Sequence, residues 1–271
     1  MIWLSTSLFC CKNEWDKLFS SGIIPFLADE KTNEFLNAYR IEFNYLSGEN
    51  IRFLLLTKEK NAPKLAKHTD EYFRNYFFST SLFTPEIKLP VNGIFMPFPA
   101  NNIKYGLYPP ETIINKEKEN YIFSIHFSQI ILDALKWNII DNESILTFAF
   151  YLQLGLIKAI NIFYPGFAPD YVDDKLLDVR IVKTQFEESR DTLQEIARDI
   201  MISRNGTEIS EWFVKWLASC KSEIKRHKDM EAKTLYSKLV FVIFKNLAIT
   251  PQMNSMLSYF IERVLLSKSN I

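Results

Sequence analysis

Apolar and polar side chains alternate in several segments of the first third of the chain. Residues Ile2–Leu8 and Tyr39–Leu46 both follow this period of two, which is typical of a strand with one buried and one polar face. The next segment, Asn50–Thr57, follows after a short connection that contains Gly48. We therefore predict an opening strand and an antiparallel hairpin.

Helical spacing governs most of the remaining sequence. It predicts a helix over Trp15–Asn37, broken into two pieces at Gly22 and Pro25, and another over Pro63–Phe78. Prolines from Pro85 to Pro110 indicate loop and edge strand, with a strand at Gly93–Phe98, because proline removes a backbone donor. Beyond them the chain is predicted to be helical over Glu119–Asn138, Glu143–Phe163, Tyr171–Ile202, Glu208–His227, Met230–Leu247 and Pro251–Ser267.

These segments predict an α+β fold with N-terminal antiparallel strands and a predominantly helical C-terminal half. We interpret residues 1–271 as a single domain, with a strand-rich part over 1–112 and a helical part over 113–271. Thr250 directly before Pro251 is typical of a helix start, with threonine as N-cap and proline in the first turn.

The longest apolar segment, Ile145–Phe163, is interrupted by Gln153, Lys158 and Asn161. Polar groups are costly in lipid, so a buried helix explains this segment better than a membrane span. The apolar beginning of the chain has no basic residues before it, which argues against a signal peptide. A cytoplasmic protein is expected.

The composition narrows the function further. Lys+Arg and Asp+Glu both number 32, so no general basic surface is expected and DNA is not a predicted partner. The chain has 3 cysteines and 3 histidines, none at metal-ligand spacing, and no glycine-rich phosphate loop or dinucleotide fingerprint. Neither a metal nor another cofactor is therefore expected. Composition and periodicity alone lead no further.

Three segments, Phe43–Phe53, Phe98–Gly106 and Ser237–Ile249, carry a more specific signal in their order and spacing. The first resembles a strand pair in which an aromatic-rich strand turns into an arginine-bearing one. The second is similar to a Tyr-x-x-Glu-x-x-Arg-Tyr-Gly motif, and the third to a segment running from a histidine to Asn-Arg-Leu. Together they resemble the C-terminal, elimination-type domain of lantibiotic dehydratases over nearly the whole chain.

This resemblance implies a function in the maturation of ribosomally synthesised peptides. Domains of the family bind a precursor peptide whose Ser or Thr side chains a partner has glutamylated, and they eliminate glutamate to leave a dehydroamino acid. The same fold occurs in thiopeptide pathways, where it joins two dehydroalanines in a formal [4+2] cycloaddition. The implied partners are a precursor peptide and a separate glutamylating dehydratase subunit.

The matched motifs also imply a set of site residues. Arg52 and Lys104 are the candidate catalytic cations: arginine pairs with carboxylates in a bidentate way, and lysine acts as a point charge. Without the resemblance, Arg52 would be interpreted as a surface arginine paired with a glutamate, and Lys104 as a solvated lysine. The candidate substrate-binding residues are Asn50, Asn101, Tyr105, His126 and Lys245. Asn50 would otherwise serve the turn, and His126 is predicted to be a buried, hydrogen-bonded core histidine.

The sequence departs from the family pattern at reactive positions. Leu54 stands where a second arginine is expected, Asn101 where the motif has glutamate, and Phe241 where it has histidine. Phenylalanine cannot transfer a proton, so glutamate elimination in its usual form is not assured. A related lyase or cyclisation step remains open, as does a catalytically inactive, peptide-binding accessory subunit of a split dehydratase complex.

Overall fold

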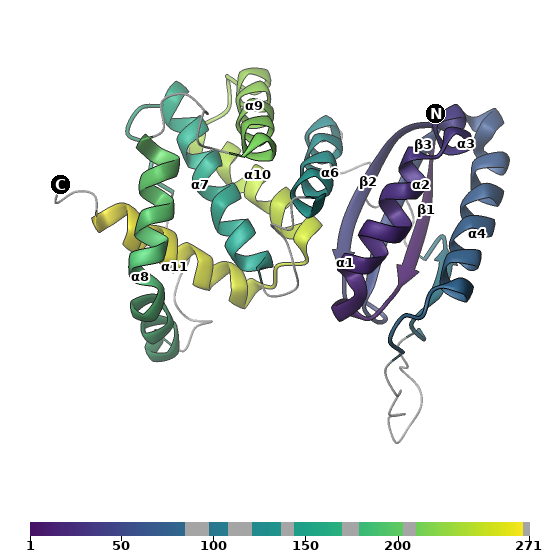
Figure 1. Ribbon diagram of the computed structural model, residues 1–271. Helices are drawn as coiled ribbons and strands as arrows, with labels where there is room; N and C mark the ends of the chain where they lie inside the picture. The colour runs from purple at the N-terminus through teal and green to yellow at the C-terminus, as the bar shows by residue number, and fades with distance from the viewer. Residues whose placement is uncertain (85–97, 108–120, 137–143, 170–178, 203–209, 268–271) are drawn as a thin grey trace. The chain divides into compact units, whose positions relative to one another are not determined.

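The computed structural model describes residues 1–84, 98–107, 121–136, 144–169, 179–202 and 210–267 (Figure 1). The chain divides into two compact units, Met1–Asn142 and Glu143–Ile271. The first contains the sheet and the second is helical. This confirms the predicted α+β class. That the two units form one domain stays a prediction.

The sheet has four antiparallel strands in the order β2-β3-β1-β4. They are β1 (Ile2–Phe9), β2 (Leu36–Asn44), β3 (Asn50–Thr57) and β4 (Asn102–Tyr105). The hairpin of β2 and β3 forms as predicted, and β3 has the predicted bounds. The opening strand β1 separates β3 from β4, so the pairings of β1 join segments far apart in the sequence.

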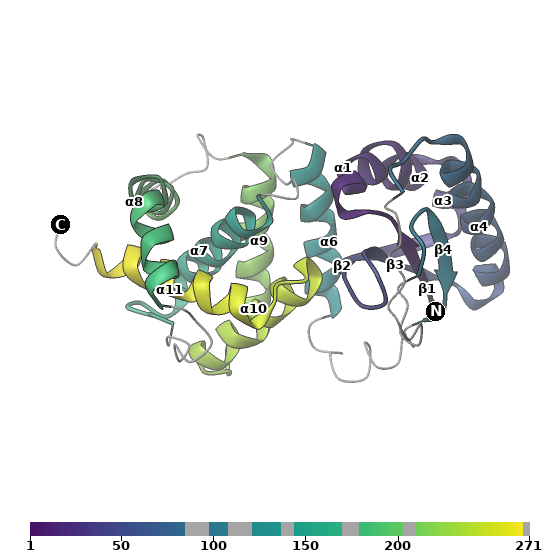
Figure 2. The ribbon, with the colours of Figure 1, turned by 90° about the horizontal axis from the view of Figure 1, so that it is seen from below.

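One face of the sheet is covered by aromatic side chains from the helices that precede and follow the hairpin. These helices are α1 (Trp15–Leu18), the π-helical turn Phe19–Ile23, α2 (Ile24–Ala28), α3 (Glu30–Phe35) and α4 (Ala62–Ser79). Phe26 and Phe73 contact Phe53 of β3, with ring centroids 5.9 and 6.2 Å away. Figure 2 shows these helices gathered on one side of the strands. This face is therefore the apolar core of the unit.

The opposite face of the sheet packs against α6 (Tyr121–Lys136). Ile125 of α6 lies against a small cluster of Trp3, Leu54 and Leu56. The Ser128 hydroxyl also accepts a hydrogen bond of 2.9 Å from the Ile41 N–H, which belongs to the edge strand β2. An edge strand exposes unpaired backbone groups, and α6 satisfies one of them here.

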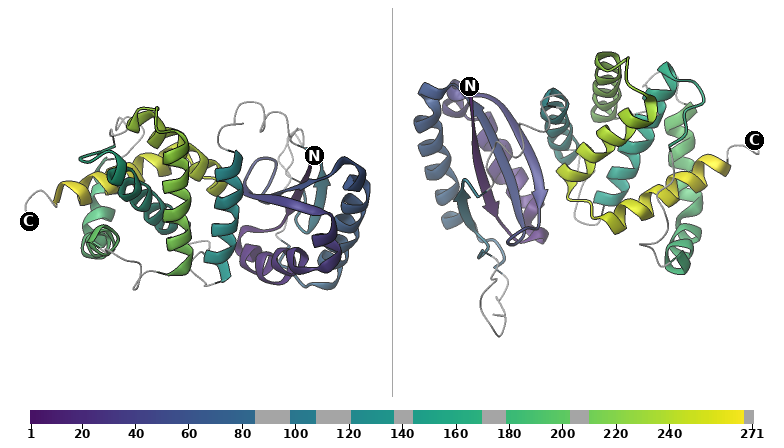
Figure 3. Two further views of the ribbon diagram at one scale, coloured as in Figure 1. Left: turned by 90° about the horizontal axis from the view of Figure 1, so that it is seen from above. Right: turned by 180° about the vertical axis from the view of Figure 1, so that it is seen from behind.

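The helical unit is built around α7 (Ile145–Phe163), which is buried along most of its length. Around it lie α8 (Val179–Ile202), α9 (Glu211–Arg226), α10 (Ala232–Leu247) and α11 (Pro251–Ser267), and Figure 3 shows the central helix among its neighbours. By length and composition α7 could cross a membrane, but 67% of its most apolar window is buried in the fold. Packing therefore accounts for its apolar character.

Several boundaries differ from the prediction. The helix predicted over Trp15–Asn37 is continuous through Gly22 and Pro25, because a π-helical turn absorbs the glycine and the proline lies in the first turn of α2. The break comes instead at Asp29, whose carboxylate accepts from the Thr32 N–H and caps α3. Strand β2 begins at Leu36, earlier than predicted.

The predicted N-cap and the later helices agree with the structure better than the prediction for the proline-rich segment. The predicted N-cap is confirmed, because the Thr250 hydroxyl accepts from the Met253 N–H at 3.3 Å. The strand β4 was predicted only as part of a loop, and the strand predicted at Gly93–Phe98 lies, except for Phe98, outside the described residues. The later helices form close to their predicted bounds, with part of Tyr171–Ile202 also outside the described residues.

The close packing of α7 at Gly155 generates a prediction. A Cβ atom there would lie 2.9 Å from Phe213 Cζ and from Trp216 Cδ1 and Nε1, too close for a real contact. Gly155→Ala should therefore lower the free energy of unfolding by about 1–3 kcal/mol, although alanine normally favours a helix. Urea denaturation followed by circular dichroism measures this.

The double variant Gly155→Ala/Trp216→Phe provides the control. The smaller ring makes room for the methyl group, so the loss caused by the glycine substitution should be smaller in this background. Equal losses in both backgrounds would show that the Trp216 ring is not what Gly155 accommodates.

Candidate functional site

The register of the sheet places one polar residue from each strand in a line. Lys104 is opposite Ser7, Ser7 is opposite Arg52, and Arg52 is opposite Glu42. Directly opposed residues on antiparallel strands point to the same face. We call these four residues the polar row. They lie on the sheet face that carries Trp3 and Leu54, away from the aromatic core.

The two candidate cations therefore share a sheet face and are separated by a single strand. With neighbouring strands about 4.8 Å apart, the Cα atoms of Arg52 and Lys104 are roughly 10 Å apart. Ser7 between them has a short side chain and is buried. Two long cationic side chains with a small residue between them can contact one polar group from two sides.

Arg52 is buried and held by a carboxylate. Its Nη1 donates to Glu42 Oε2 at 2.7 Å, while Arg40 Nη2 donates to Glu42 Oε1 at 3.0 Å. Only 6% of Arg52 and 2% of Glu42 are exposed, so water hardly screens this pairing. We call Arg40, Glu42 and Arg52 the arginine–glutamate triad. The expectation of a glutamate partner is confirmed, but Arg52 lies in the interior and not on the surface.

Lys104 lies in β4 and is less enclosed. It is partly exposed, and its Nζ lies 5.3 Å from the centroid of the Phe98 ring. Phe98 in turn contacts Phe9 of β1, with ring centroids 5.0 Å apart. A cation over an aromatic face is stabilised by the ring quadrupole, so Phe98 restricts the directions that Lys104 adopts.

The two candidate asparagines serve turns. Asn50 is fully buried and its Nδ2 donates to the carbonyls of Leu46 and Gly48, at 3.2 and 2.7 Å, which closes the hairpin loop. Asn101 has φ of 58°, a left-handed conformation that asparagine tolerates well, and its Nδ2 donates to Thr84 Oγ1 at 2.8 Å. Asn50 still faces the polar row, because it is two residues from Arg52 on the same strand.

Tyr105 points away from the two cations. It follows Lys104 on β4, and successive strand residues face opposite sides of the sheet. Its hydroxyl donates to Asp70 Oδ1 of α4 at 2.7 Å. Burial and this carboxylate raise the pKa of Tyr105 well above its ordinary value. The phenol therefore stays protonated and ties β4 to α4 on the core side.

His126 differs from the prediction in one respect. It was expected to be a buried core histidine, but its side chain is exposed on α6. Ser124 and Ser128, two residues before and after it, are buried. Residues two apart on a helix differ by about 200° in direction, so His126 points away from the helix face that those serines occupy.

The remaining candidate, Lys245, belongs to the helical unit. It is half-buried near the end of α10, one residue before the buried Asn246. Phe241, which the sequence comparison matched to the family histidine, is 58% exposed on the same helix, and this match stays a prediction. The assignment of substrate binding to Lys245 stays a prediction.

Sequence reasoning missed Ser7, Arg40 and Glu42. Ser7 and Glu42 appeared only as polar positions in alternating strands, and nothing local distinguishes them from solvent-facing residues. The signal lies in the register, which places both next to Arg52. Within the described ranges, no group of three or more His, Cys, Asp or Glu side chains is placed to hold a metal ion.

The burial of the arginine–glutamate triad generates a prediction. Glu42→Gln removes the negative charge between two buried guanidinium groups. Breaking a buried ion pair from one side typically costs about 3–5 kcal/mol of unfolding free energy. We expect a loss of this size in urea denaturation at pH 7.

Glu71→Gln is the matched control. Glu71 also pairs with a cation, Lys67, at 3.7 Å, but its side chain is 60% exposed. An exposed pair contributes about 1 kcal/mol or less, so this variant should unfold almost as the unaltered chain does. Similar losses in the two variants would contradict the burial argument.

Comparisons with known proteins found solved structures of similar fold. The chain is similar in structure to "Pyridine synthase, TbtD, from thiomuracin biosynthesis", with a TM-score of 0.73, 13% identity and 98% of each chain covered. It is also similar to TsrL, with a TM-score of 0.64, 10% identity, and 100% of this chain and 96% of TsrL covered.

A third similar structure is that of the tRNA-dependent lantibiotic dehydratase MibB from Microbispora sp. 107891. The TM-score is 0.56 at 11% identity, and the likeness covers 99% of this chain but 28% of MibB. No family model matches the sequence, and no curated protein is a significant sequence relative. At these identities the likeness concerns the fold. The chain therefore has the lantibiotic dehydratase-like fold that its motif order predicted, shared with the thiomuracin pyridine synthase.

Proposed function

We propose that this protein acts on a modified, ribosomally synthesised precursor peptide and promotes a ring-forming step. The observation that carries the proposal is the placement of Arg52 and Lys104 on one sheet face, with Ser7 between them. The likeness in fold to a pyridine synthase over 98% of both chains supports the peptide class of the substrate.

The proposed chemistry needs positioning and charge stabilisation more than proton transfer. Joining two dehydroalanine residues in a cycloaddition polarises an amide carbonyl, and cationic donors stabilise the charge that develops on its oxygen. In this proposal the Arg52 guanidinium and the Lys104 ammonium contact that oxygen from either side of Ser7. The arginine–glutamate triad holds Arg52 in position before the peptide binds.

Ring formation is favoured over glutamate elimination by two features of this chain. Elimination needs a group that removes the α-proton, and the matched position holds Phe241, which cannot do so. The likeness in structure to the pyridine synthase, with a TM-score of 0.73, is also greater than the likeness to MibB, with a TM-score of 0.56. A separate glutamylating subunit would then act earlier, on the same precursor. That partner and the cytoplasmic location stay predictions.

A second candidate function is peptide binding without chemistry, as an accessory subunit of a dehydratase complex. The deep burial of Arg52 in the triad favours it, because this arginine then has a sufficient role in the sheet itself. Both functions require a precursor peptide. They differ in whether loss of the cations affects turnover or only affinity.

Mass spectrometry of a dehydroalanine-containing precursor incubated with the protein tests the proposal. We expect a cyclised product, together with any leader fragment that is released. Arg52→Met and Lys104→Met should each slow its formation by on the order of 100-fold, as is typical when one donor to a developing charge is removed. Fluorescence polarisation of the labelled precursor measures binding in the same variants.

Lys60→Met is the control, because Lys60 is an exposed lysine in the same unit. It should leave turnover and binding unchanged. Circular dichroism verifies that each variant is folded. A cycloaddition alone leaves the mass unchanged, so the fragment spectrum has to show whether the two dehydroalanines are joined. If the unaltered protein binds the precursor and both its mass and its fragment spectrum stay those of the linear peptide, the accessory function replaces the catalytic one. If both cation variants turn over at the normal rate, the polar row is not the site.

A further inference from the structure

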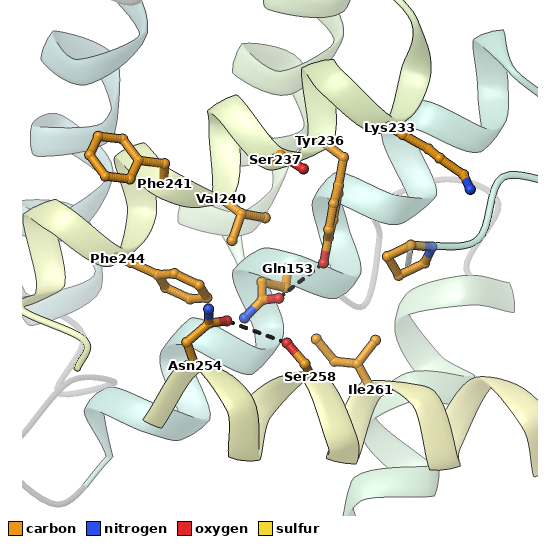
Figure 4. Close-up of a pocket in the computed structure, with 11 residues that line it drawn as sticks. Gln153, Lys233, Tyr236, Ser237, Val240, Phe241, Phe244, Asn254, Ser258 and Ile261 are labelled. Carbon is orange, nitrogen blue, oxygen red and sulfur yellow. Dashed lines mark hydrogen bonds between the residues drawn. The ribbon is translucent and has the colours of Figure 1, made fainter. Parts of the chain in front are cut away.

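The helical unit contains a cavity of about 260 Å³ between α7, α10 and α11, far along the chain from the polar row. Pockets for drug-sized ligands usually measure about 300–1,000 Å³, so this one suits a single side chain or a similar small group. Figure 4 shows the residues that line it. None of the proposed steps at Arg52 and Lys104 uses this cavity.

The cavity contains a buried amide group with an unused donor. Gln153 of α7 is 1% exposed, and its Oε1 accepts a hydrogen bond of 3.0 Å from the Tyr236 hydroxyl. Its Nε2 is buried and has no hydrogen-bond partner among the described residues. Leaving a buried donor unsatisfied costs about 1–3 kcal/mol, so an acceptor placed in the cavity would recover that free energy.

Other polar groups of the lining also offer hydrogen-bond donors to the cavity. The Asn254 Oδ1 accepts from the Ser258 hydroxyl at 3.3 Å, which leaves the amide N–H groups of Asn254 as its donors. Lys233 is exposed at the rim, and the lining contains no carboxylate among the described residues. In Figure 4 the Gln153 side chain is drawn between those of Tyr236 and Asn254. The cavity therefore offers donors to a ligand that accepts.

The apolar part of the lining indicates that the ligand also has a hydrocarbon part. Val240, Phe244 and Ile261 contribute hydrocarbon surface next to the amides. A ligand that fills the cavity therefore combines a short aliphatic part with one hydrogen-bond acceptor. The side chains of leucine or norleucine have the first property without the second.

A neutral acceptor fits this lining better than a charged one. Burying a carboxylate costs several kcal/mol unless a well-placed cation compensates it. Lys233 is exposed, and an exposed ion pair contributes about 1 kcal/mol or less. The buried groups are neutral amides and hydroxyls, which solvate a carbonyl oxygen without requiring a counter-charge.

We propose that this cavity binds a primary carboxamide on a short aliphatic chain, the group that asparagine and glutamine side chains carry. Its carbonyl oxygen accepts from Gln153 Nε2, and its methylene groups contact Val240 and Ile261. Its N–H groups donate to hydroxyl oxygens of the lining such as those of Tyr236 and Ser258. The inference rests on the proposed function only in assigning the carboxamide to the precursor peptide. It adds to that function a selective contact for one residue of the peptide.

Ligand-observed NMR titrations of the full chain test the site without any precursor. The probes are N-acetyl-L-glutamine methylamide, the corresponding glutamate compound and the norleucine compound. We expect the glutamine probe to bind more tightly than both others. Gln153→Met should weaken its binding roughly fivefold, the value of one hydrogen bond. Tyr236→Phe, a milder change, should also weaken it, because the hydroxyl orients the Gln153 amide.

Lys225→Met is the control, because Lys225 is an exposed lysine of α9 and does not line the cavity. It should bind the glutamine probe as the unaltered chain does. If the glutamate probe binds more tightly than the glutamine probe, the ligand is not neutral. If the Gln153→Met and Tyr236→Phe variants both bind the glutamine probe as tightly as the unaltered chain does, the cavity is not the binding site. Neither result bears on precursor turnover, so this inference and the proposed function can fail separately.

Discussion

The register of β1 is the constraint on which the candidate site depends. This strand pairs with β3 on one side and β4 on the other, so Ser7 is opposite Arg52 and Lys104 at once. A shift of one residue in either pairing would turn one cation toward the aromatic core and leave the other on the opposite face. The alternation that buries Leu8 and Phe53 with the core helices is therefore also what brings the cations together.

The arginine–glutamate triad adds little to the stability of this sheet for the number of charges that it buries. A buried ion pair gains little net stability, because desolvation of the charges offsets most of their attraction. Apolar residues at the same positions would stabilise the sheet at least as well. The proposed function gives the triad a use: Glu42 holds the Arg52 guanidinium in one orientation on the face of the polar row, so a bound peptide does not have to order a flexible side chain.

Local patterns were sufficient for most elements and insufficient for the site. The bounds of β3 and α11 follow from the apolar segment after the connection at Gly48 and from the Thr250–Pro251 helix start, both of which are short-range signals. Strand β4 has only four residues after a proline-rich segment, so its pattern is too short to recognise. Its partner β1 lies at the other end of a long stretch of chain, with Thr6 opposite Tyr105. Without β4, the opposite directions of Lys104 and Tyr105 could not be foreseen. In the sequence, Gln153 is only a polar residue that interrupts an apolar helix. That its amide is buried could be learned only from the structure.

The arginine–glutamate triad is expected to position Arg52 without being required for the stability of the sheet. The most direct measurement is the free energy of unfolding of the triple variant Arg40→Met/Glu42→Leu/Arg52→Met, in which apolar side chains replace all three charges. We predict a folded, cooperative protein, as stable as the unaltered chain or about 1–4 kcal/mol more stable, because the three charges of the triad are removed together. A triple variant that unfolds, or that loses as much stability as Glu42→Gln alone, would contradict it.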